Sequence, residues 1–276
     1  MKNALLLVLL IGYLVFPQAS HAQISIAPTT VFMDQNGIGS LFITNPSDVA
    51  QEIIISFEFG YPGNDELGSL IMVYGDSIRE KQSGMGDRIR SFPRTFILTP
   101  QQQQTVRLQV RPDRSLPEGT YFTRVKVTSN AQTTDIEQTT TEGVSTQVNF
   151  KFDQIIAAFH KVGAVTTGLE FGEVNIEVKD GSVKVIPEFT VTGNSPYLGS
   201  VTATLKNSAN EILAEQEQTV ALYFSGKRAV EMKLPENLPT GAYQIVLTYE
   251  TRRSDIPSTD LVQAPAVSKT INLTIQ

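Results

Sequence analysis

The segment Leu116-Pro117-Glu118-Gly119-Thr120-Tyr121 occurs a second time, with two substitutions, as Leu238-Pro239-Thr240-Gly241-Ala242-Tyr243. Each copy precedes a run in which apolar and polar residues alternate, which is the pattern of a strand with one buried face. The proline and the glycine set a turn, and the tyrosine begins the strand, where its hydroxyl can reach back to the backbone upstream. The repeat therefore predicts two equivalent turns, each leading into a half-buried strand.

Such a turn resembles the tyrosine corner of immunoglobulin-like sandwiches. The two copies lie about 120 residues apart, and one sandwich of this kind needs roughly 100 residues. A short motif can also recur by chance, but duplication of the fold explains the spacing better. We therefore predict an all-β chain with two immunoglobulin-like β-sandwich domains, residues 23–161 and 162–276, with a hinge near Lys161–Gly168.

Strand-like segments recur along the whole chain between Gly, Pro, Asn and Asp, and almost no helical period is found. The predicted strands of the first half are Ile24–Ala27, Thr30–Met33, Ile38–Asn45, Gln51–Phe59, Leu70–Tyr74, Thr95–Leu98, Gln104–Arg111, Gly119–Ser129 and Val144–His160. Those of the second half are Leu169–Lys179, Ser182–Thr192, Gly199–Leu205, Ile212–Ala221, Lys227–Lys233, Gly241–Arg252 and Ala266–Ile275. Two long loops are expected, Gly60–Ser91 and Asn130–Gly143, either functional or plain solvated linkers.

The N-terminal segment Met1–Ala22 is typical of a signal peptide. Lys2 supplies the positive charge, an apolar run follows, and Ser20-His21-Ala22 forms a cleavage site of the small-x-small type. A membrane anchor is the alternative, although the apolar run is short for a span of about 20 residues. We expect export to the periplasm, with the cell surface or secretion as the alternative, and no membrane insertion of the mature chain.

Composition argues against several classes of function. The 276 residues carry a formal net charge of −6 without a Lys/Arg block, so nucleic acid is an unlikely partner. The chain has no cysteine and only two histidines, and His21 leaves with the signal peptide. His160 alone cannot form a metal cluster, and no nucleotide-binding, metalloprotease or nucleophile-elbow motif is present. Paired acids of a glycosidase are not singled out either, so we expect no enzyme, no metal and no cofactor.

One strand stands out as a candidate binding element. Val148, Phe150 and Phe152 alternate with Asn149, Lys151 and Asp153, which places the apolar side chains on one face. The strand follows the Thr/Gln-rich loop and ends the first predicted domain. Its apolar face either fills the core of that domain or forms an exposed edge that meets a partner. The candidate partner-binding residues on this face are Val148, Phe150 and Phe152.

Several motifs of the chain resemble those of the periplasmic pilus chaperones of the chaperone–usher pathway, the PapD-like family. In the first predicted domain these are Ile43-Thr44-Asn45-Pro46-Ser47, Phe92-Pro93-Arg94, Leu98-Thr99-Pro100, Val106-Arg107-Leu108 and Leu116-Pro117. In the second they are Gly193–Gly199, Tyr223 and Leu238–Tyr249. Together they span essentially the whole mature chain, although each motif is short.

The resemblance implies a non-catalytic, chaperone-like protein that binds pilin-like or other secreted subunits. In that family, alternating apolar residues on the last long strand of the first domain dock into an incomplete subunit and supply its missing strand. By register these positions fall on Val148, Phe150 and Phe152, with Val144 as a further candidate. An outer-membrane usher is a further partner that the family implies. The alternative is a structural or adhesive immunoglobulin-like module of the cell surface.

The sequence departs from the family at one important place. Typical members anchor the carboxylate at the subunit's C-terminus with two basic residues between the domains. The matching positions here are Thr29 and Ala157, and neither is charged. Either the partner is held differently, or the protein serves another client.

Overall fold

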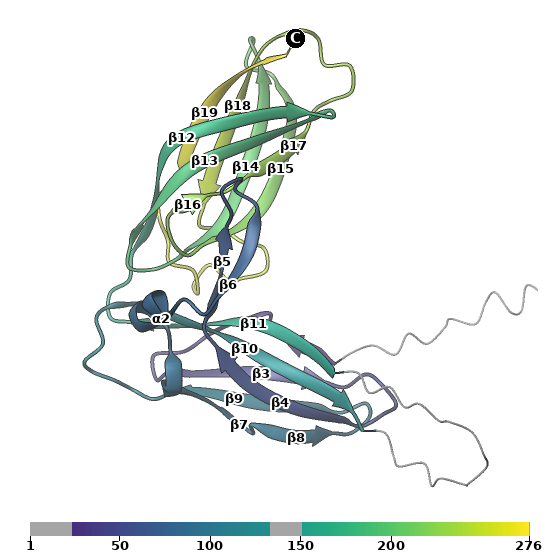
Figure 1. Ribbon diagram of the computed structural model, residues 1–276, viewed down its shortest axis with the longest axis vertical. Helices are drawn as coiled ribbons and strands as arrows, with labels where there is room; N and C mark the ends of the chain where they lie inside the picture. Colours follow the sequence, from purple (N-terminus) through teal and green to yellow (C-terminus); the bar gives the residue numbers. More distant parts are fainter. Residues whose placement is uncertain (1–23, 133–150, 276) are drawn as a thin grey trace, which may run out of the picture.

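The computed structural model describes residues 24–132 and 151–275, which form two β-sandwiches set at an angle to each other (Figure 1). The prediction of an all-β fold with two immunoglobulin-like sandwiches is confirmed. The predicted division at Lys161 remains a prediction. The strands on either side of it are β11 (Lys151–Val162) and β12 (Thr167–Lys179).

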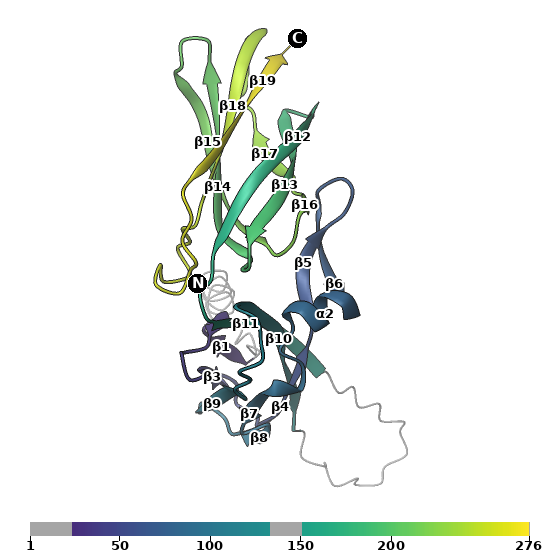
Figure 2. The same cartoon turned by 90° about the vertical axis from the view of Figure 1, so that its left-hand side faces the viewer.

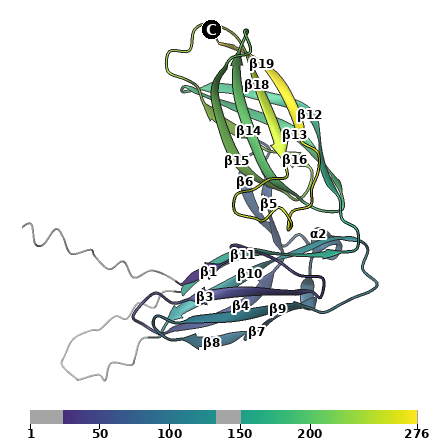
Figure 3. The same cartoon turned by 180° about the vertical axis from the view of Figure 1, so that it is seen from behind.

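The first sandwich consists of two facing sheets, which are seen from behind in Figure 3. One sheet has the order β1-β3-β9-β7, formed by Ser25–Ala27, Ile38–Thr44, Gln103–Val110 and Ile89–Phe92. The other has the order β2-β11-β10-β4-β8, formed by Thr30–Phe32, Lys151–Val162, Gly119–Ala131, Gln51–Glu58 and Thr95–Leu98. The chain thus changes sheet between β1 and β2, and β2 is the parallel neighbour of β11.

The second sandwich repeats the two-sheet arrangement. One sheet has the order β15-β14-β18-β19, formed by Ile212–Leu222, Tyr197–Asn207, Gly241–Glu250 and Val267–Ile275. In the other, β13 (Ser182–Gly193) pairs with β12 on one side and with β16 (Gly226–Lys227) and β17 (Val230–Lys233) on the other. Each sandwich encloses its own apolar core, as the alternating strands predict.

The two Leu-Pro-x-Gly-x-Tyr turns are equivalent in the structure. The Tyr121 hydroxyl donates a hydrogen bond to the carbonyl of Pro117 at 3.0 Å, and the Tyr243 hydroxyl donates to that of Pro239 at 2.7 Å. Both tyrosine rings are buried in the core of their own sandwich. The predicted role of the repeat, a tyrosine that ties the start of a strand to the turn before it, is confirmed.

The segment Gly60–Ser91 is not the long loop that its glycines and acidic residues suggested. It contains the hairpin of β5 (Gly60–Asn64) and β6 (Leu70–Tyr74), the helix α2 (Ser77–Ser83), the short helix η1 (Gly86–Arg88) and most of β7. Only β6 was expected. The hairpin reaches from the first sandwich onto the second, beside β13 and β16 (Figure 2). Its strands are stabilised by this contact, which local composition cannot reveal.

Three parts of the chain lie outside the described residues: 1–23, 133–150 and 276. The predicted signal peptide belongs to the first of them. The second predicted loop, Asn130–Gly143, lies in the next from residue 133 onward, whereas Asn130 and Ala131 form the end of β10 instead of a loop. Within the described ranges, no helix has both the length and the apolar character needed to cross a bilayer.

The motif Ile43–Ser47 is ordered around one buried amide. The Asn45 side chain donates to the carbonyls of Val49 at 2.8 Å and Leu98 at 3.0 Å, and its oxygen accepts from the Ser47 hydroxyl at 2.7 Å. It thereby joins the end of β3 to the end of β8 across the two sheets. A fully buried amide is tolerated because its donors and acceptor are all satisfied.

We predict that Asn45→Ala lowers the free energy of unfolding by about 1–3 kcal/mol, because buried carbonyls lose their donor. Asn175→Ala is the matched control, since Asn175 is exposed on β12. Thermal and urea unfolding of both variants measure the effect. Equal stability of the two variants would contradict the structural role of Asn45.

Candidate protein-binding edge

Strand β11 is fully paired on one side and only partly paired on the other. Residues 151–162 pair with β10 along their whole length, from Lys151↔Asn130 to Val162↔Gly119. On the opposite side, β2 pairs only with Ala157–Phe159. In the described part of the chain, no strand pairs with residues 151–156 on that side. This half of β11 is therefore an edge strand, of the kind that can accept another strand.

The pairing fixes which backbone groups point outward at this edge. The Phe159 carbonyl accepts a hydrogen bond from the Met33 backbone N–H at 2.8 Å, so the polar groups of Phe159 face β2. Because the N–H and C=O groups of successive residues alternate between the two sides of a strand, odd-numbered residues share this orientation. The outward backbone groups of the open half thus belong to Lys151, Asp153 and Ile155.

The side chains of β11 alternate between two apolar clusters. Ile156 and Ala158 belong to the core of the first sandwich, whereas Ala157 and Phe159 belong to a cluster between the sandwiches. Phe152 shares the parity of Ile156 and lies on the core-side face. It nevertheless remains 41% exposed, because it lies towards the end of the strand. Of the four predicted binding residues only Phe152 is described; Val144, Val148 and Phe150 lie outside the described residues.

The open half of β11 is held in place by side-chain contacts with β10 and with Ile24. Asp153 accepts a hydrogen bond from the Thr128 hydroxyl at 2.5 Å and lies 3.8 Å from the Lys126 ammonium, both on β10. The Gln154 side chain donates to the carbonyl of Ile24 at 2.7 Å. These contacts order the strand without using its outward backbone groups.

An aromatic cluster between the sandwiches fixes the other half of β11. This inter-sandwich cluster contains Phe59, Tyr61, Phe122, Ala157, Phe159, Leu198, Tyr223, Ile256 and Leu261. The Tyr223 ring lies edge-on to Phe122, with 4.6 Å between centroids, and the Arg124 guanidinium lies 5.5 Å from the Tyr223 centroid. Burial raises the pKa of Tyr223. Sequence analysis singled out Tyr223 but not the other aromatic residues of this cluster. Most of them lie in predicted strands, and alternation of apolar and polar residues along a strand also fits an ordinary core.

The two uncharged positions Thr29 and Ala157 line the same pocket of about 200 Å³ at this junction. Two arginines from other elements line it as well, Arg124 on β10 and Arg253 after β18. Arg124 donates to the carbonyl of Gly60 at 3.0 Å, and Arg253 forms two hydrogen bonds with the Asp255 carboxylate at 2.9 and 2.6 Å. The structure therefore supplies cations to the junction that sequence analysis missed.

His160, the one histidine of the predicted mature chain, lies in β11 opposite Tyr121. Its Nδ1 atom is buried and has no hydrogen-bond partner among the described residues. Burial lowers the pKa of His160 from its ordinary value of 6.5, and the nearby Arg88 charge lowers it further, against a smaller opposite effect of Asp34. The folded protein therefore disfavours the imidazolium form.

The depressed pKa of His160 predicts a pH-dependent stability. As pH falls below about 6.5, the unfolded chain binds a proton at His160 that the folded protein resists, so stability is lost. We expect the melting temperature to fall more between pH 7.5 and pH 5.0 in the wild type than in His160→Gln, which does not titrate. An identical pH dependence in both proteins would show that His160 does not contribute.

Comparison with known proteins gives matches only among solved structures. No protein-family model matches the chain, and no curated protein sequence matches it significantly. The crystal structure of the YadV chaperone is 11% identical and covers 91% of this chain and 100% of its own, with a TM-score of 0.47. The CsuC–CsuE chaperone–tip adhesion subunit complex of Acinetobacter baumannii is 11% identical, with coverages of 90% and 98% and a TM-score of 0.45.

A third similar structure is the Salmonella enterica SafA pilin in complex with the SafB chaperone, at 10% identity, coverages of 90% and 96%, and a TM-score of 0.42. Each of these three structures of chaperones, alone or with a subunit, matches about nine-tenths of the length of this chain.

Proposed function

We propose that the protein is a non-catalytic chaperone that binds an extended segment of a partner protein along the open half of β11. The observation that carries this proposal is the outer edge of residues 151–156, where no described strand pairs. An unpaired edge next to an exposed aromatic side chain is a hazard that soluble proteins normally cover. Keeping it open is explained if its role is to meet a partner strand.

The chemistry of the edge fits strand addition. The outward N–H and C=O groups of Lys151, Asp153 and Ile155 can form a ladder with an incoming strand, and this gives affinity independent of sequence. Phe152 and the adjoining Val148 and Phe150 of the alternating run would supply the side chains that select the partner. Burial of one phenylalanine side chain contributes about 1.5–3 kcal/mol.

The motif resemblance assigns the partner class and the compartment. The partners would be pilin-like or other secreted subunits that lack a strand of their own sandwich, met in the periplasm after export. An outer-membrane usher would then receive the complex. The chaperone would act by completing the sandwich of the subunit and so covering its apolar groove.

Arg124 and Arg253 offer a way to hold the end of such a partner. Both line the pocket between the sandwiches that also contains Thr29 and Ala157. Thr29 and Ala157 are uncharged and cannot anchor a carboxylate. We therefore assign this role to Arg124 and Arg253. Their guanidinium groups would bind the C-terminal carboxylate of the segment added along β11.

A proline at the open edge tests the backbone ladder. In Asp153→Pro the outward N–H is lost, whereas the hydrogen bonds to β10 use even-numbered residues and are retained. Asp153→Ala is the matched control, because it removes the contacts with Thr128 and Lys126 but keeps the N–H. The client is first captured from periplasmic extract with the wild-type protein and identified by mass spectrometry. We expect it to bind Asp153→Ala and not to bind Asp153→Pro.

Both variants must first show a cooperative thermal transition at similar temperature. Equal client binding by the folded proline and alanine variants would exclude pairing through the outer edge of β11.

Charges on the apolar face test the side-chain contribution. Phe150→Asp combined with Phe152→Asp should abolish client binding while leaving the fold largely intact, because two apolar contacts worth about 3–6 kcal/mol together are removed. Phe92→Asp is the control, since Phe92 is 53% exposed on the edge strand β7 of the opposite sheet. Pull-down and thermal melting are measured together on each protein.

Unfolding of the double variant would favour the core interpretation of these phenylalanines. A folded double variant that still binds its client would place the interaction on another surface.

A further inference from the structure

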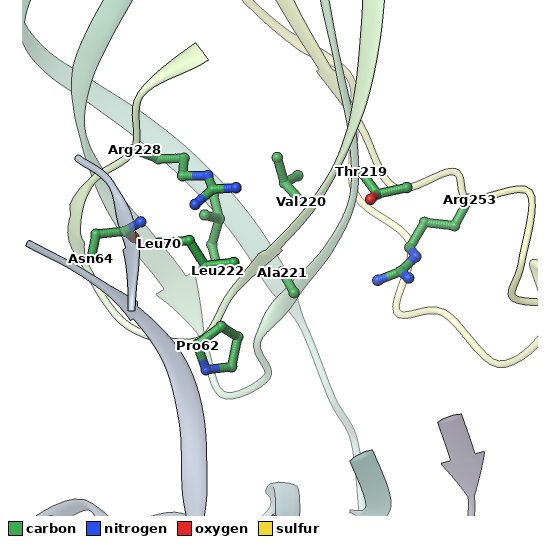
Figure 4. Close-up of a pocket in the computed structure, with 9 residues that line it drawn as sticks. All are labelled: Pro62, Asn64, Leu70, Thr219, Val220, Ala221, Leu222, Arg228 and Arg253. Atoms are coloured by element: carbon green, nitrogen blue, oxygen red, sulfur yellow. The ribbon is translucent and has the colours of Figure 1, made fainter. Parts of the chain in front are cut away.

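A second pocket, of about 160 Å³, lies between the β5–β6 hairpin and the second sandwich (Figure 4). Pro62, Asn64 and Leu70 of the hairpin form one wall, and Val220 and Leu222 of β15 form another. Figure 4 shows the Arg228 side chain entering from the connection between β16 and β17 and extending towards Val220 and Leu222. The pocket is thus built from both halves of the chain.

The hairpin is fixed over this pocket by the backbone. The Ala229 N–H donates a hydrogen bond to the carbonyl of Gly68 at the hairpin turn, at 2.9 Å. A side chain at Gly68 would collide with the Ala229 nitrogen, since an added Cβ would lie 2.6 Å from it. Close backbone contact therefore positions the hairpin wall next to Arg228.

Arg228 differs from the other partly buried arginines of the described chain. Arg88, Arg124 and Arg253 each donate to at least one protein oxygen, namely those of Gly84, Gly60 and Asp255. Among the described residues, no carboxylate lies within 4 Å of the Arg228 guanidinium. None of the N–H groups of this guanidinium has a protein acceptor there either. The Arg228 side chain is half-buried. A guanidinium that is partly shielded from water and has no protein acceptor is stabilised by an added anion, which is why proteins normally pair it.

The surroundings of Arg228 select for a negative ligand. The residues lining the pocket include no aspartate or glutamate. Burial lowers the pKa of Arg228, yet an arginine stays protonated in proteins. The walls next to it are largely apolar, with the Asn64 amide as an additional polar group.

From this geometry we infer that the pocket beneath the β5–β6 hairpin binds a carboxylate carried on a short aliphatic chain. The planar guanidinium of Arg228 would take the carboxylate in a two-point hydrogen-bonded pair. Leu70, Leu222 and Pro62 would cover the methylene groups. The volume fits a small group rather than a folded segment. The pocket shares Pro62, Ala221 and Arg253 with the junction pocket, but Arg228 lines this pocket and not the other. The inference therefore does not depend on the proposed chaperone function.

The same carboxylate chemistry can come from a free small acid or from an acidic side chain of a partner protein. Glutarate represents the first source, and a glutamate blocked by acetyl and amide groups represents the second. Glutaramide, which has a similar shape but no charge, is the negative control. Calorimetric titration of the purified protein with each compound measures the dissociation constants. Inorganic phosphate tests whether any oxyanion suffices.

We expect glutarate, the blocked glutamate or both to bind, and glutaramide not to bind. Arg228→Met, which retains an apolar stem, should weaken the binding at least tenfold, whereas Arg114→Met, at an exposed arginine, should leave it unchanged. Ligand should also slow hydrogen exchange at the Ala229 amide, which joins the two walls. If Arg228→Met fails to fold, Leu70→Trp tests the same site by obstructing its rim.

The proposal is overturned if neither carboxylate binds the wild type, or if both bind Arg228→Met as well as Arg114→Met. Tighter binding of phosphate than of either carboxylate would overturn the assignment of the ligand class. None of these results affects client binding at β11, which is measured separately.

Discussion

The structure depends on the fact that β10 and β11 each contribute side chains to two apolar clusters, one on each face of the sheet. One face of each strand packs in the core of the first sandwich, through Val125, Val127, Ile156 and Ala158. The opposite face, through Phe122 and Phe159, packs against Tyr223 of the second sandwich. A sheet covered on both faces at one end is rigid there. Because the second sandwich covers only that end, the start of β11 remains accessible.

This asymmetry explains why an exposed edge can persist in a stable protein. The open half is held by the pairing of residues 151–156 with β10, and by the contacts of Asp153 with Thr128 and of Gln154 with Ile24. Within residues 24–132 and 151–275, the outer side is paired only where β2 runs alongside, at Ala157–Phe159. The strand is therefore ordered before any partner arrives, which reduces the conformational entropy that binding must overcome.

The β5–β6 hairpin gives the two sandwiches a second connection besides the aromatic cluster. Tyr61 at its base lies 4.7 Å from the Phe224 ring centroid and donates its hydroxyl to Asp76, and these surroundings raise its pKa to about 12. The main cause is burial, followed by the hydrogen bond to the Asp76 carboxylate. At the other end the hairpin turn bonds to Ala229. The same contact that joins the halves creates the pocket around Arg228.

The sequence by itself determined the all-β class, the two sandwiches and most strands, because these follow from local alternation and from the repeated turn with its tyrosine hydroxyl. Thr95–Leu98 was predicted without error, and most other strands differed by one or two residues. Leu70–Tyr74 was also predicted with its correct bounds, but β5, β7 and α2 were missed. Gly60–Asn64 has turn-like composition and is stabilised as a strand by residues far along the chain. Only the tertiary structure decided which side chains lie between the sandwiches. It also brought Arg124 and Arg253 to the junction, and it left the Arg228 guanidinium without an acceptor among the described residues. Alternation predicts that a strand has two faces, but only the packing of distant strands decides which face or edge is covered.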